Sequence, residues 1–385
     1  MRSDHEARAK NDGAGFGAAR RIVLKVGTST LTGGKAIVDP RRITALAQDV
    51  AGAVHGGRKV LVVSSGAIIT GGGLLGRQHL VRSLPHKQAL AAVGQPLLMH
   101  VYALAFKRLG LRVGQVLLNQ QDFADQRRYV NARQTLEALL EFGIIPIINE
   151  NDTVATDEIR IGDNDTLSAL VASLIGADLL VILSDVEGLM TADPRRYRDA
   201  RLIPTVTRID STVLRAARRT VTAQGVGGMA TKIGAARIAT ESGVATVITS
   251  GTRSLPLTEL LEGERHGTLF LPTGHHPSSR RRWLALGFPA RGTVIVDDGA
   301  RDALRRGKSL LAAGILDVLG AFEPGDAVTI QDARGDEFGR GVSNYPSGQL
   351  AQIKGIRSGE IARLLGGGTP GEVIHRDNLV LREEG

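Results

Sequence analysis

Short apolar runs alternate with longer amphipathic stretches through the first 270 residues, and this alternation restricts the possible folds more than any other feature of the chain. Each run is apolar throughout, which predicts a strand buried on both faces. Such strands separated by helices are typical of an α/β fold with a mainly parallel sheet sandwiched by helices. The predicted strands are Ile22–Val26, Val60–Val63, Val113–Leu118, Ile144–Ile148, Leu179–Leu183 and Ala245–Ile248, and the predicted helices include Arg41–Val54, Lys87–Leu109, Asn131–Phe142, Thr166–Ile175 and Met229–Ser242.

The pattern changes after a stretch rich in Pro, Gly, Ser and Arg. Beyond it, Gly and Asp turns separate short predicted strands, which is typical of a small β-rich barrel or sandwich. These strands are Thr293–Val296, Ala327–Ile330, Arg340–Tyr345 and Glu372–Ile374, with one helix near Asp302–Leu311. We therefore expect a disordered extension at residues 1–19, an α/β domain at 20–274, a linker at 275–289 and a small β-rich domain at 290–385.

Composition excludes several classes of site. The chain has no cysteine, which rules out disulfides, thiolate metal sites and cysteine nucleophiles. Its nine histidines lack the spacing of metal ligands, so we predict no metal ion fixed by protein side chains. No apolar run approaches the roughly 18 residues of a membrane span, and the N-terminus lacks the apolar core of a signal peptide. These features predict a cytoplasmic protein with no membrane contact.

The formal net charge of +9 raises nucleic acid as a partner. Residues 291–385, however, contain 12 Lys and Arg against 14 Asp and Glu, so the whole basic excess lies in the first 290 residues. Anionic small molecules would explain that excess as well as RNA would.

Small or polar residues follow four of the six predicted strands. In an open parallel sheet, ligands bind beyond the carboxyl ends of the strands, so these residues are expected to share one edge. One such ending is ordinary turn chemistry, whereas four at one edge favour a binding site. The four segments are Lys25–Ser29, Ser64–Ala67, Asn149–Asp152 and Ser184–Asp185.

Two lysines stand beside glycines in this part of the chain. Lys25 precedes Gly27 near the end of an apolar strand, where it can extend into solvent or face the phosphates of a ligand. With nine lysines against 39 arginines in the chain, a lysine at this place favours the phosphate role. Lys232 follows a glycine-rich helix start at Val226–Lys232, which offers backbone N–H groups and a helix N-terminus to an anion, although it is not a P-loop.

Acidic and amide residues surround the fourth strand and the following helix. Asp163 and Thr166 can be simple helix caps. Alternatively, the polar residues of this region can bind an ammonium group, help hold Mg²⁺ or orient the lysines; they are Asp152, Asp163, Asn164 and Asp165. The sequence shows no Ser-His-Asp pattern and no kinase-type catalytic loop. A carboxylate acceptor, with a pKa of about 4, needs no general base. The residues therefore favour phosphoryl transfer from ATP to a carboxylate of a small amino-acid substrate.

Several motifs, in this order, resemble those of the glutamate 5-kinase family. They are Lys25–Ser29, Val63–Ala67, Ile148–Asp152, Ile161–Asp165, Thr191–Arg195 and Gly227–Lys232. In the C-terminal part, Asp298–Ala300, Ser309–Ile315 and Arg340–Gly341 resemble the PUA domain that this family often carries. The resemblance runs from about Arg21 nearly to the end of the chain.

This resemblance implies an amino-acid-kinase fold and ATP-dependent phosphorylation of the γ-carboxylate of L-glutamate to γ-glutamyl 5-phosphate, the first step of proline biosynthesis. It implies Lys25, Lys232 and Asp165 as catalytic residues, and Ser65, Asp152 and Asn164 as glutamate ligands. It implies ATP binding by Lys25, Gly27, Thr28, Ser184, Asp185, Val226, Gly227, Gly228, Met229, Ala230, Thr231 and Lys232.

The resemblance also implies Mg²⁺ with ATP, proline as a feedback inhibitor, a homo-oligomer, and transfer of the product to a glutamyl phosphate reductase. Two positions depart from the family pattern. Val226 replaces a common threonine, which removes a hydroxyl but keeps the N–H, and Met190 replaces a frequent tyrosine.

Two other functions compete with this interpretation. A related kinase acting on aspartate, acetylglutamate or UMP would share the fold and some glycine loops, but the Asn149–Asp152 and Gly162–Asp165 motifs with a PUA-like tail favour glutamate. An RNA-binding or RNA-modifying protein is the second alternative, because PUA domains elsewhere bind RNA. The acidic excess of the tail and its few aromatic residues oppose RNA binding.

Overall fold

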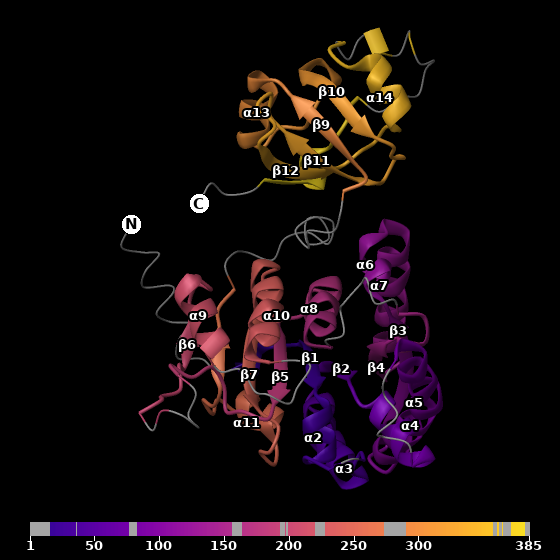
Figure 1. Ribbon diagram of the computed structural model, residues 1–385, viewed down its shortest axis with the longest axis vertical. Helices are drawn as coiled ribbons and strands as arrows, with labels where there is room; N and C mark the ends of the chain where they lie inside the picture. The colour runs from indigo at the N-terminus through magenta and orange to yellow at the C-terminus, as the bar shows by residue number, and fades with distance from the viewer. Residues whose placement is uncertain are drawn as a thin grey trace. The chain divides into compact units, whose positions relative to one another are not determined.

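A computed structural model describes residues 16–35, 37–76, 83–155, 164–192, 197, 199–219, 228–272, 290–356, 360–361, 364 and 371–381. The chain forms two compact units. The first contains an eight-stranded sheet and the second a five-stranded sheet (Figure 1).

The sheet of the first unit has the order β3-β4-β2-β1-β5-β7-β8-β6. Its strands are β1 (Arg21–Val26), β2 (Lys59–Ser64), β3 (Arg112–Leu118), β4 (Ile144–Glu150), β5 (Leu179–Ser184), β6 (Thr205–Val206), β7 (Ala245–Ser250) and β8 (Thr268–Phe270). Every neighbouring pair is parallel except β7 with β8, which confirms the mainly parallel α/β fold. All six predicted strands are present. The sequence did not reveal β6 and β8, which have only two and three residues.

Helices cover both faces of this sheet (Figure 1). They are α2 (Thr28–Thr32), α3 (Pro40–His55), α4 (Ala67–Leu75), α5 (Leu84–Lys107), α7 (Gln126–Glu141), α8 (Asn164–Ile175), α9 (Ser211–Arg219), α10 (Met229–Glu241) and α11 (Pro256–Leu261). Helix α6 (Gln120–Ala124) lies almost wholly in the segment Gln121–Val130, which groups with the second unit. One buried cluster joins Ile22, Leu24 and Val26 of β1 to apolar side chains of α3, α5 and α11. Because side chains alternate along a strand, Lys25 points to the other face, where α8 packs on β1 and α10 packs on α8.

Helix α5 is apolar enough, by length and composition, to cross a membrane: its most apolar window has a mean hydropathy of 1.5. The sequence expectation that no segment approaches this length is therefore corrected for α5. The helix nevertheless packs as a core helix, because Tyr102 and Phe106 are fully buried in the cluster on the sheet. Its polar Gln95 is also buried within the protein.

The second unit has strands in the order β10-β9-β11-β12-β13. They are β9 (Gly292–Val296), β10 (Ile315–Gly320), β11 (Ala327–Gln331), β12 (Glu337–Val342) and β13 (Leu379–Leu381), with helices α13 (Asp298–Arg305) and α14 (Ser347–Ile353). Alternate residues of β9 and β11 face a core with Tyr345 and Leu350. This is a separate β-rich unit with its own core.

Details of the second unit differ from the sequence prediction. The helix expected near Asp302–Leu311 starts at Asp298 and ends at Arg305, because Asp297 caps it by accepting a hydrogen bond from the Ala300 N–H at 2.7 Å. The strand expected at Arg340–Tyr345 is Glu337–Val342.

The predicted strand at Glu372–Ile374 is only an isolated bridge between Ile374 and Leu310. Strands β10 and β13 were not predicted. At the other end of the chain, Phe16–Ala18 forms a short 3-10 helix inside the segment expected to be disordered, and the rest of that extension, apart from Ala19, lies outside the described residues.

Candidate active site

A buried ionic cluster lies at the carboxyl edge of the first sheet. Lys25 Nζ forms an ion pair with Asp165 Oδ1, and Lys232 Nζ lies 3.1 Å from Asp165 Oδ2. The side chains of Lys25, Asp165 and Lys232 are 6%, 0% and 8% exposed. Thr231 Oγ1 donates a further hydrogen bond of 3.1 Å to Asp165 Oδ2. One carboxylate therefore connects two ammonium groups that are 207 positions apart in the sequence.

Three elements bring these groups together. Lys25 is the penultimate residue of β1, level with Val63 of β2 and Ile182 of β5. Asp165 lies in the first turn of α8, and Lys232 in the first turn of α10, which packs beside α8. The alternation of side chains along β1 points Lys25 toward the face where α8 and α10 pack. The starts of these two helices then supply Asp165 and Lys232.

The charge balance of the cluster favours an anion. Burial opposes ionisation of Asp165, but the ammonium groups of Lys25 and Lys232 outweigh it and hold the pKa of that carboxyl below its usual value. With Asp165 ionised, these three groups carry a net charge of +1. A buried excess of positive charge is costly unless an anion approaches it, and a phosphoryl group has the required charge.

A second, neutral cluster adjoins the ionic one. Asn164 Nδ2 donates to Ser65 Oγ at 2.8 Å, to Asn149 Oδ1 at 3.1 Å and to the Ser64 carbonyl at 3.3 Å. Ser65 is placed by Gly66, whose φ of 109° turns the chain sharply from β2 into α4 and would strain any other residue. The cluster thus joins the ends of β2 and β4 to the start of α8.

Asp152 follows β4 in a one-turn 3-10 helix, Asp152–Val154. Burial raises the pKa of its carboxyl to about 6. This turn packs against α5, where Gln88 Nε2 donates to the Ala155 carbonyl at 2.9 Å. A carboxylate with a raised pKa gains stability when a cation binds it, so Asp152 suits an ammonium ligand.

The described nucleotide candidates lie at the ends of β1 and β5 and at the start of α10. Gly27 precedes α2, and a Cβ added there would lie 3.4 Å from Lys25 Nζ, so a glycine leaves room beside the lysine. Ser184 Oγ donates to Asp185 Oδ1 at 3.2 Å. Gly228 precedes α10 with no side-chain cap on the first N–H groups of that helix.

Thr28 begins α2, and Met229, Ala230, Thr231 and Lys232 form the first turn of α10. The predicted nucleotide residues Val226 and Gly227 lie outside the described residues. Within the described part of the chain, no group of three or more His, Asp or Glu side chains is placed to hold a metal ion.

The structure also brings into the site residues for which the sequence patterns predict no role. Asn149 belongs to a motif found from sequence, but its place between Asn164 and α5 was not foreseen. Gln95 Oε1 accepts a hydrogen bond from Asn149 Nδ2 at 2.9 Å, and Tyr102 pairs with Ser64 at 2.8 Å. A buried glutamine in an otherwise apolar helix face was the available signal, because buried amides require partners.

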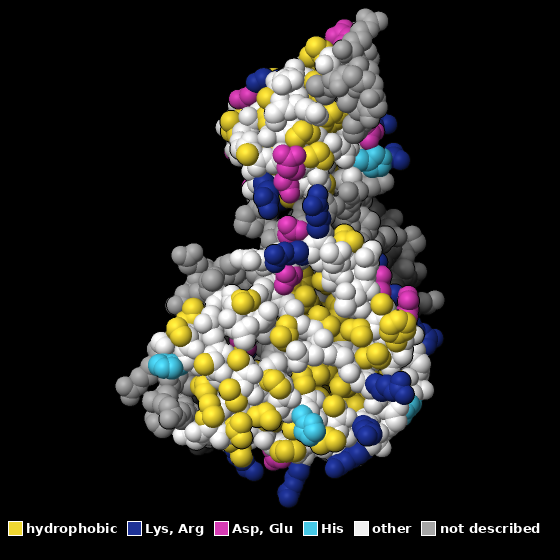
Figure 2. Space-filling model, turned by 90° about the vertical axis from the view of Figure 1, so that its right-hand side faces the viewer, with side chains coloured by type: hydrophobic (Ala, Val, Ile, Leu, Met, Phe, Trp, Pro, Cys, Tyr) yellow, Lys and Arg dark blue, Asp and Glu magenta, His cyan; other side chains and the backbone are white. Residues whose placement is uncertain are grey.

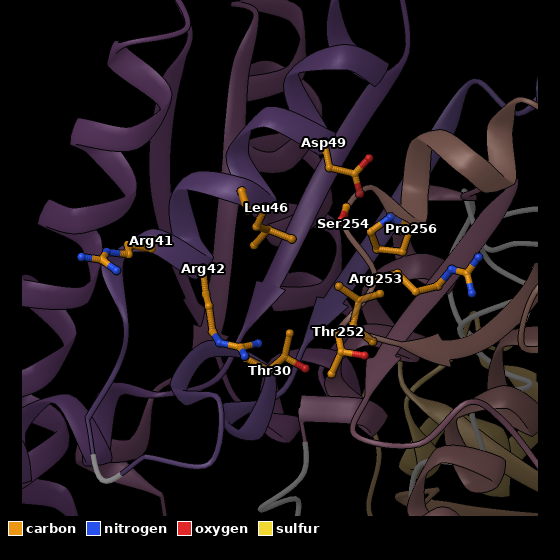
Figure 3. Close-up of a pocket in the computed structure, with 12 residues that line it drawn as sticks. Thr30, Arg41, Arg42, Leu46, Asp49, Thr252, Arg253, Ser254 and Pro256 are labelled. Carbon is orange, nitrogen blue, oxygen red and sulfur yellow. The ribbon is translucent and has the colours of Figure 1, made fainter.

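A pocket of about 320 Å³ lies beside this edge, between α2, α3, the end of β5 and the loop after β7. In Figure 3, Arg42 points toward Thr30, whereas Arg41 and Arg253 point away to either side. Arg42 donates to the Thr30 carbonyl at 3.2 Å, and Arg253 pairs with Glu259 at 2.7 Å. The charged groups of this pocket do not converge, and none of the predicted site residues lines it.

The chain matches the amino acid kinase family over residues 20–250 and the PUA domain over residues 292–365. It is 48% identical to a glutamate 5-kinase of Moorella thermoacetica, over 94% of this chain and 96% of that protein. It is 47% identical to a glutamate 5-kinase of Citrifermentans bemidjiense, over 94% of this chain and 97% of that protein. A carbamate kinase from Giardia lamblia bound to AMP-PNP aligns with a TM-score of 0.48 and 19% identity, over 66% of this chain and 99% of that one.

Proposed function

The chain belongs to the amino acid kinase family and to its glutamate 5-kinase branch, and from this premise we propose which of its residues carry out the reaction. It is an ATP-dependent kinase that phosphorylates the γ-carboxylate of L-glutamate to γ-glutamyl 5-phosphate, the first step of proline biosynthesis. The observation that best supports the assignment of residues is the buried Lys25–Asp165–Lys232 cluster with its net positive charge.

Lys25 and Lys232 neutralise the phosphoryl group as it passes from ATP to the substrate oxygen. Negative charge is spread over the equatorial oxygens in that transition state, and fixed cations in a dry site stabilise it without reorganisation. Asp165 holds both ammonium groups in place, and its lowered pKa keeps it ionised at neutral pH. The acceptor carboxylate of glutamate is already ionised, so no general base is required.

Ser65, Asn164 and Asp152 bind glutamate. The Oδ1 atom of Asn164 is buried and has no hydrogen-bond partner among the described residues, which leaves an acceptor for an ammonium group. Asp152 supplies a negative charge for the same ammonium. Ser65 receives the amide of Asn164 on its oxygen, and its own hydroxyl hydrogen is available to a carboxylate oxygen.

ATP binds to Lys25, Gly27, Thr28, Ser184, Asp185 and the segment from Val226 to Lys232. Helix starts and glycine loops present N–H groups to phosphates. Mg²⁺ fits as a partner of the phosphates, since the described residues offer no carboxylate cluster to hold it independently. When bound, it would neutralise charge on the phosphate oxygens.

The chain acts in the cytoplasm as a homo-oligomer. Leu74, Leu75, Leu97 and Leu104 on α4 and α5 are 36–63% exposed, and Figure 2 shows hydrophobic side chains gathered on this face of the first unit. Such a patch is typical of a surface that a second subunit covers. Family membership also supports feedback inhibition by proline and transfer of the labile acyl phosphate to a glutamyl phosphate reductase as proposals for this chain.

Hydroxylamine trapping tests this function. With ATP and Mg²⁺, the enzyme should form γ-glutamyl hydroxamate from glutamate, and aspartate and N-acetylglutamate should be much poorer substrates. A chain length wrong by one methylene misplaces the attacking oxygen, and an error of about 1 Å can cost about 10²-fold in rate. The Lys232→Ala variant controls for background hydroxamate. Equal rates with aspartate and glutamate would show that the substrate assignment is wrong.

A further inference from the structure

A chain of side-chain amides runs from α5 through β4 to the proposed glutamate site. Gln95 Oε1 on α5 accepts from Asn149 Nδ2 at 2.9 Å, and Asn149 Oδ1 accepts from Asn164 Nδ2 at 3.1 Å. Gln95 is 8% exposed and Asn149 2% exposed. Each hydrogen bond that a buried amide fails to make costs free energy. The orientations of the three amides therefore depend on one another.

Two backbone groups fix the direction of the chain. The Glu150 N–H donates to Asn149 Oδ1 at 2.9 Å, and a backbone N–H can only donate. The Ser64 carbonyl accepts from Asn164 Nδ2 at 3.3 Å, and a carbonyl can only accept. A carboxamide has its oxygen on one side and its NH₂ on the other. Asn149 must therefore turn its NH₂ toward α5, where Gln95 supplies the acceptor.

Close packing places α5 for this contact. A Cβ on Gly94 would collide with the Ala67 carbonyl and the backbone of Gly71 in α4, so only glycine permits this approach. Gln95 is the next residue, and α4 begins directly after Ser65 and Gly66. The position of Gln95 relative to the end of β2 is thus set by backbone contacts.

The amide chain also decides which atom Asn164 presents. Its Nδ2 is engaged with Ser65, Asn149 and the Ser64 carbonyl, while its Oδ1 is buried and has no partner among the described residues. If the Asn164 amide rotated by half a turn, its NH₂ group would take the place of that oxygen. An ammonium ligand needs the oxygen there, and the NH₂ would repel it.

We propose that Gln95 is a positioning residue for glutamate binding, which acts by accepting a hydrogen bond from Asn149 and so holding Asn164 Oδ1 toward the substrate ammonium. This inference rests on the proposed role of Asn164 in binding glutamate. Gln95 acts only through Asn149 and Asn164, so its effect belongs to the KM for glutamate and not to the KM for ATP.

Four variants separate this role from general packing of α5. Gln95→Met keeps the length of the side chain but lacks a strong acceptor, and Gln95→Asn keeps an amide whose oxygen is one methylene too short. Gln95→Glu restores an acceptor for Asn149. Gln115→Met is the matched control, because it removes only the other hydrogen bond of Gln95, from Nε2 to Gln115 Oε1 at 3.2 Å.

Steady-state kinetics of these full-length variants test the proposal. Gln95→Met and Gln95→Asn should each raise the KM for glutamate about 3- to 10-fold, the effect of losing one hydrogen bond, with the KM for ATP unchanged. Gln95→Glu and Gln115→Met should remain within about twofold of the parent enzyme. An unchanged glutamate KM in a folded Gln95→Met or Gln95→Asn variant overturns the proposal, as does an equal rise in both KM values.

A double variant distinguishes this proposal from the assignment of Asn164. Asn164→Ala alone should raise the KM for glutamate, and if it does not, the proposed function of Asn164 fails. Adding Gln95→Met to Asn164→Ala should change the glutamate KM no further, because the residue that Gln95 orients is gone. A further rise of the same size as in the parent enzyme would show that Gln95 acts by another route, and would contradict the inference.

Discussion

Two halves of the site meet at the start of α8, where Asn164 and Asp165 are neighbours in sequence. The Asp165 side is ionic and joins Lys25 and Lys232, whereas the Asn164 side is neutral and joins Ser65 and Asn149. The contacts of the ionic half are buried and those of Asn164 in the neutral half are partly buried. The physical quantity that each half fixes is also different. The ionic half fixes an electrostatic potential, and the neutral half fixes the direction of dipoles.

This difference assigns each half to a different step. A phosphoryl group in transfer carries negative charge that must be stabilised as the bonds change, so loss of positive charge should slow turnover. A bound amino acid is recognised before any bond changes, so a misdirected amide should weaken binding of the substrate. We therefore expect the ionic half to control kcat and the neutral half to control the KM for glutamate.

The largest effect is expected for the lysines. Lys25→Ala and Lys232→Ala should each lower kcat by about 10²–10³, with smaller changes in the KM for glutamate, because each removes one group that stabilises the transition state. Coupled measurement of ADP release would give both parameters. Lys59→Ala, at the exposed start of β2, is a control that should leave kcat unchanged. A lysine variant with normal kcat and a raised KM would break the division between the halves.

Asp152→Asn should have an intermediate effect, and on the KM for glutamate instead of on kcat. Asp152→Asn keeps the shape of the side chain but removes its charge, so the KM for glutamate should rise about 10- to 100-fold, the usual loss for a hydrogen bond to a charged group. The KM for ATP should stay the same. If turnover were abolished while the glutamate KM was unchanged, Asp152 would belong to the ionic half instead.

The same residue predicts a pH dependence. Burial raises the pKa of Asp152 to about 6, so this carboxyl becomes protonated and neutral as the pH falls through about 6. A neutral acid no longer attracts an ammonium group, so kcat/KM for glutamate should fall below pH 6. The profile of kcat/KM should show this acidic limb in the parent enzyme and lack it in Asp152→Asn. Identical profiles for the two proteins would contradict the assignment.

The smallest effect is expected when the residues after Pro289 are removed. All described site residues lie between Lys25 and Lys232, so a chain ending near Pro289 should keep kcat and the glutamate KM within about threefold. The isolated tail, which has more acidic than basic residues, should bind mixed RNA no better than a neutral control protein at physiological salt. A truncated protein that is folded but inactive would show that the site needs both units.

Sequence patterns were sufficient for the features that depend on local periodicity. The six apolar runs are strands, and the polar residues that follow β1, β2, β4 and β5 share one sheet edge, because parallel strands all point the same way. The proximity of Lys25, Asp165 and Lys232 agrees with the family motifs, although their roles stay predictions. The predicted boundaries of helices and strands were wrong where a single contact decides them. The Asp297 cap, for example, starts α13 at Asp298, earlier in the chain than predicted.

The remaining features depend on contacts between distant residues. Gln95 and Asn149 are 54 positions apart. A glutamine on an apolar helix face indicates that its amide needs a partner, but not which amide of which strand that partner is. The register of β10 against β9, which includes a shift between Ile315 and Asp317, likewise depends on how the second unit closes on its core. Such pairings become visible only when the chain is folded.

The neighbours Asn164 and Asp165 allow the most direct test of the division between the halves. Steady-state kinetics of Asn164→Ala and Asp165→Asn, with thermal melting to confirm folding, would compare two adjacent positions of one helix. Asn164→Ala should raise the KM for glutamate and leave kcat within about threefold, whereas Asp165→Asn should lower kcat by about 10²–10³ with little change in that KM. If both variants changed the same parameter by similar factors, the site would act as a single unit and its division into an ionic and a neutral half would be wrong.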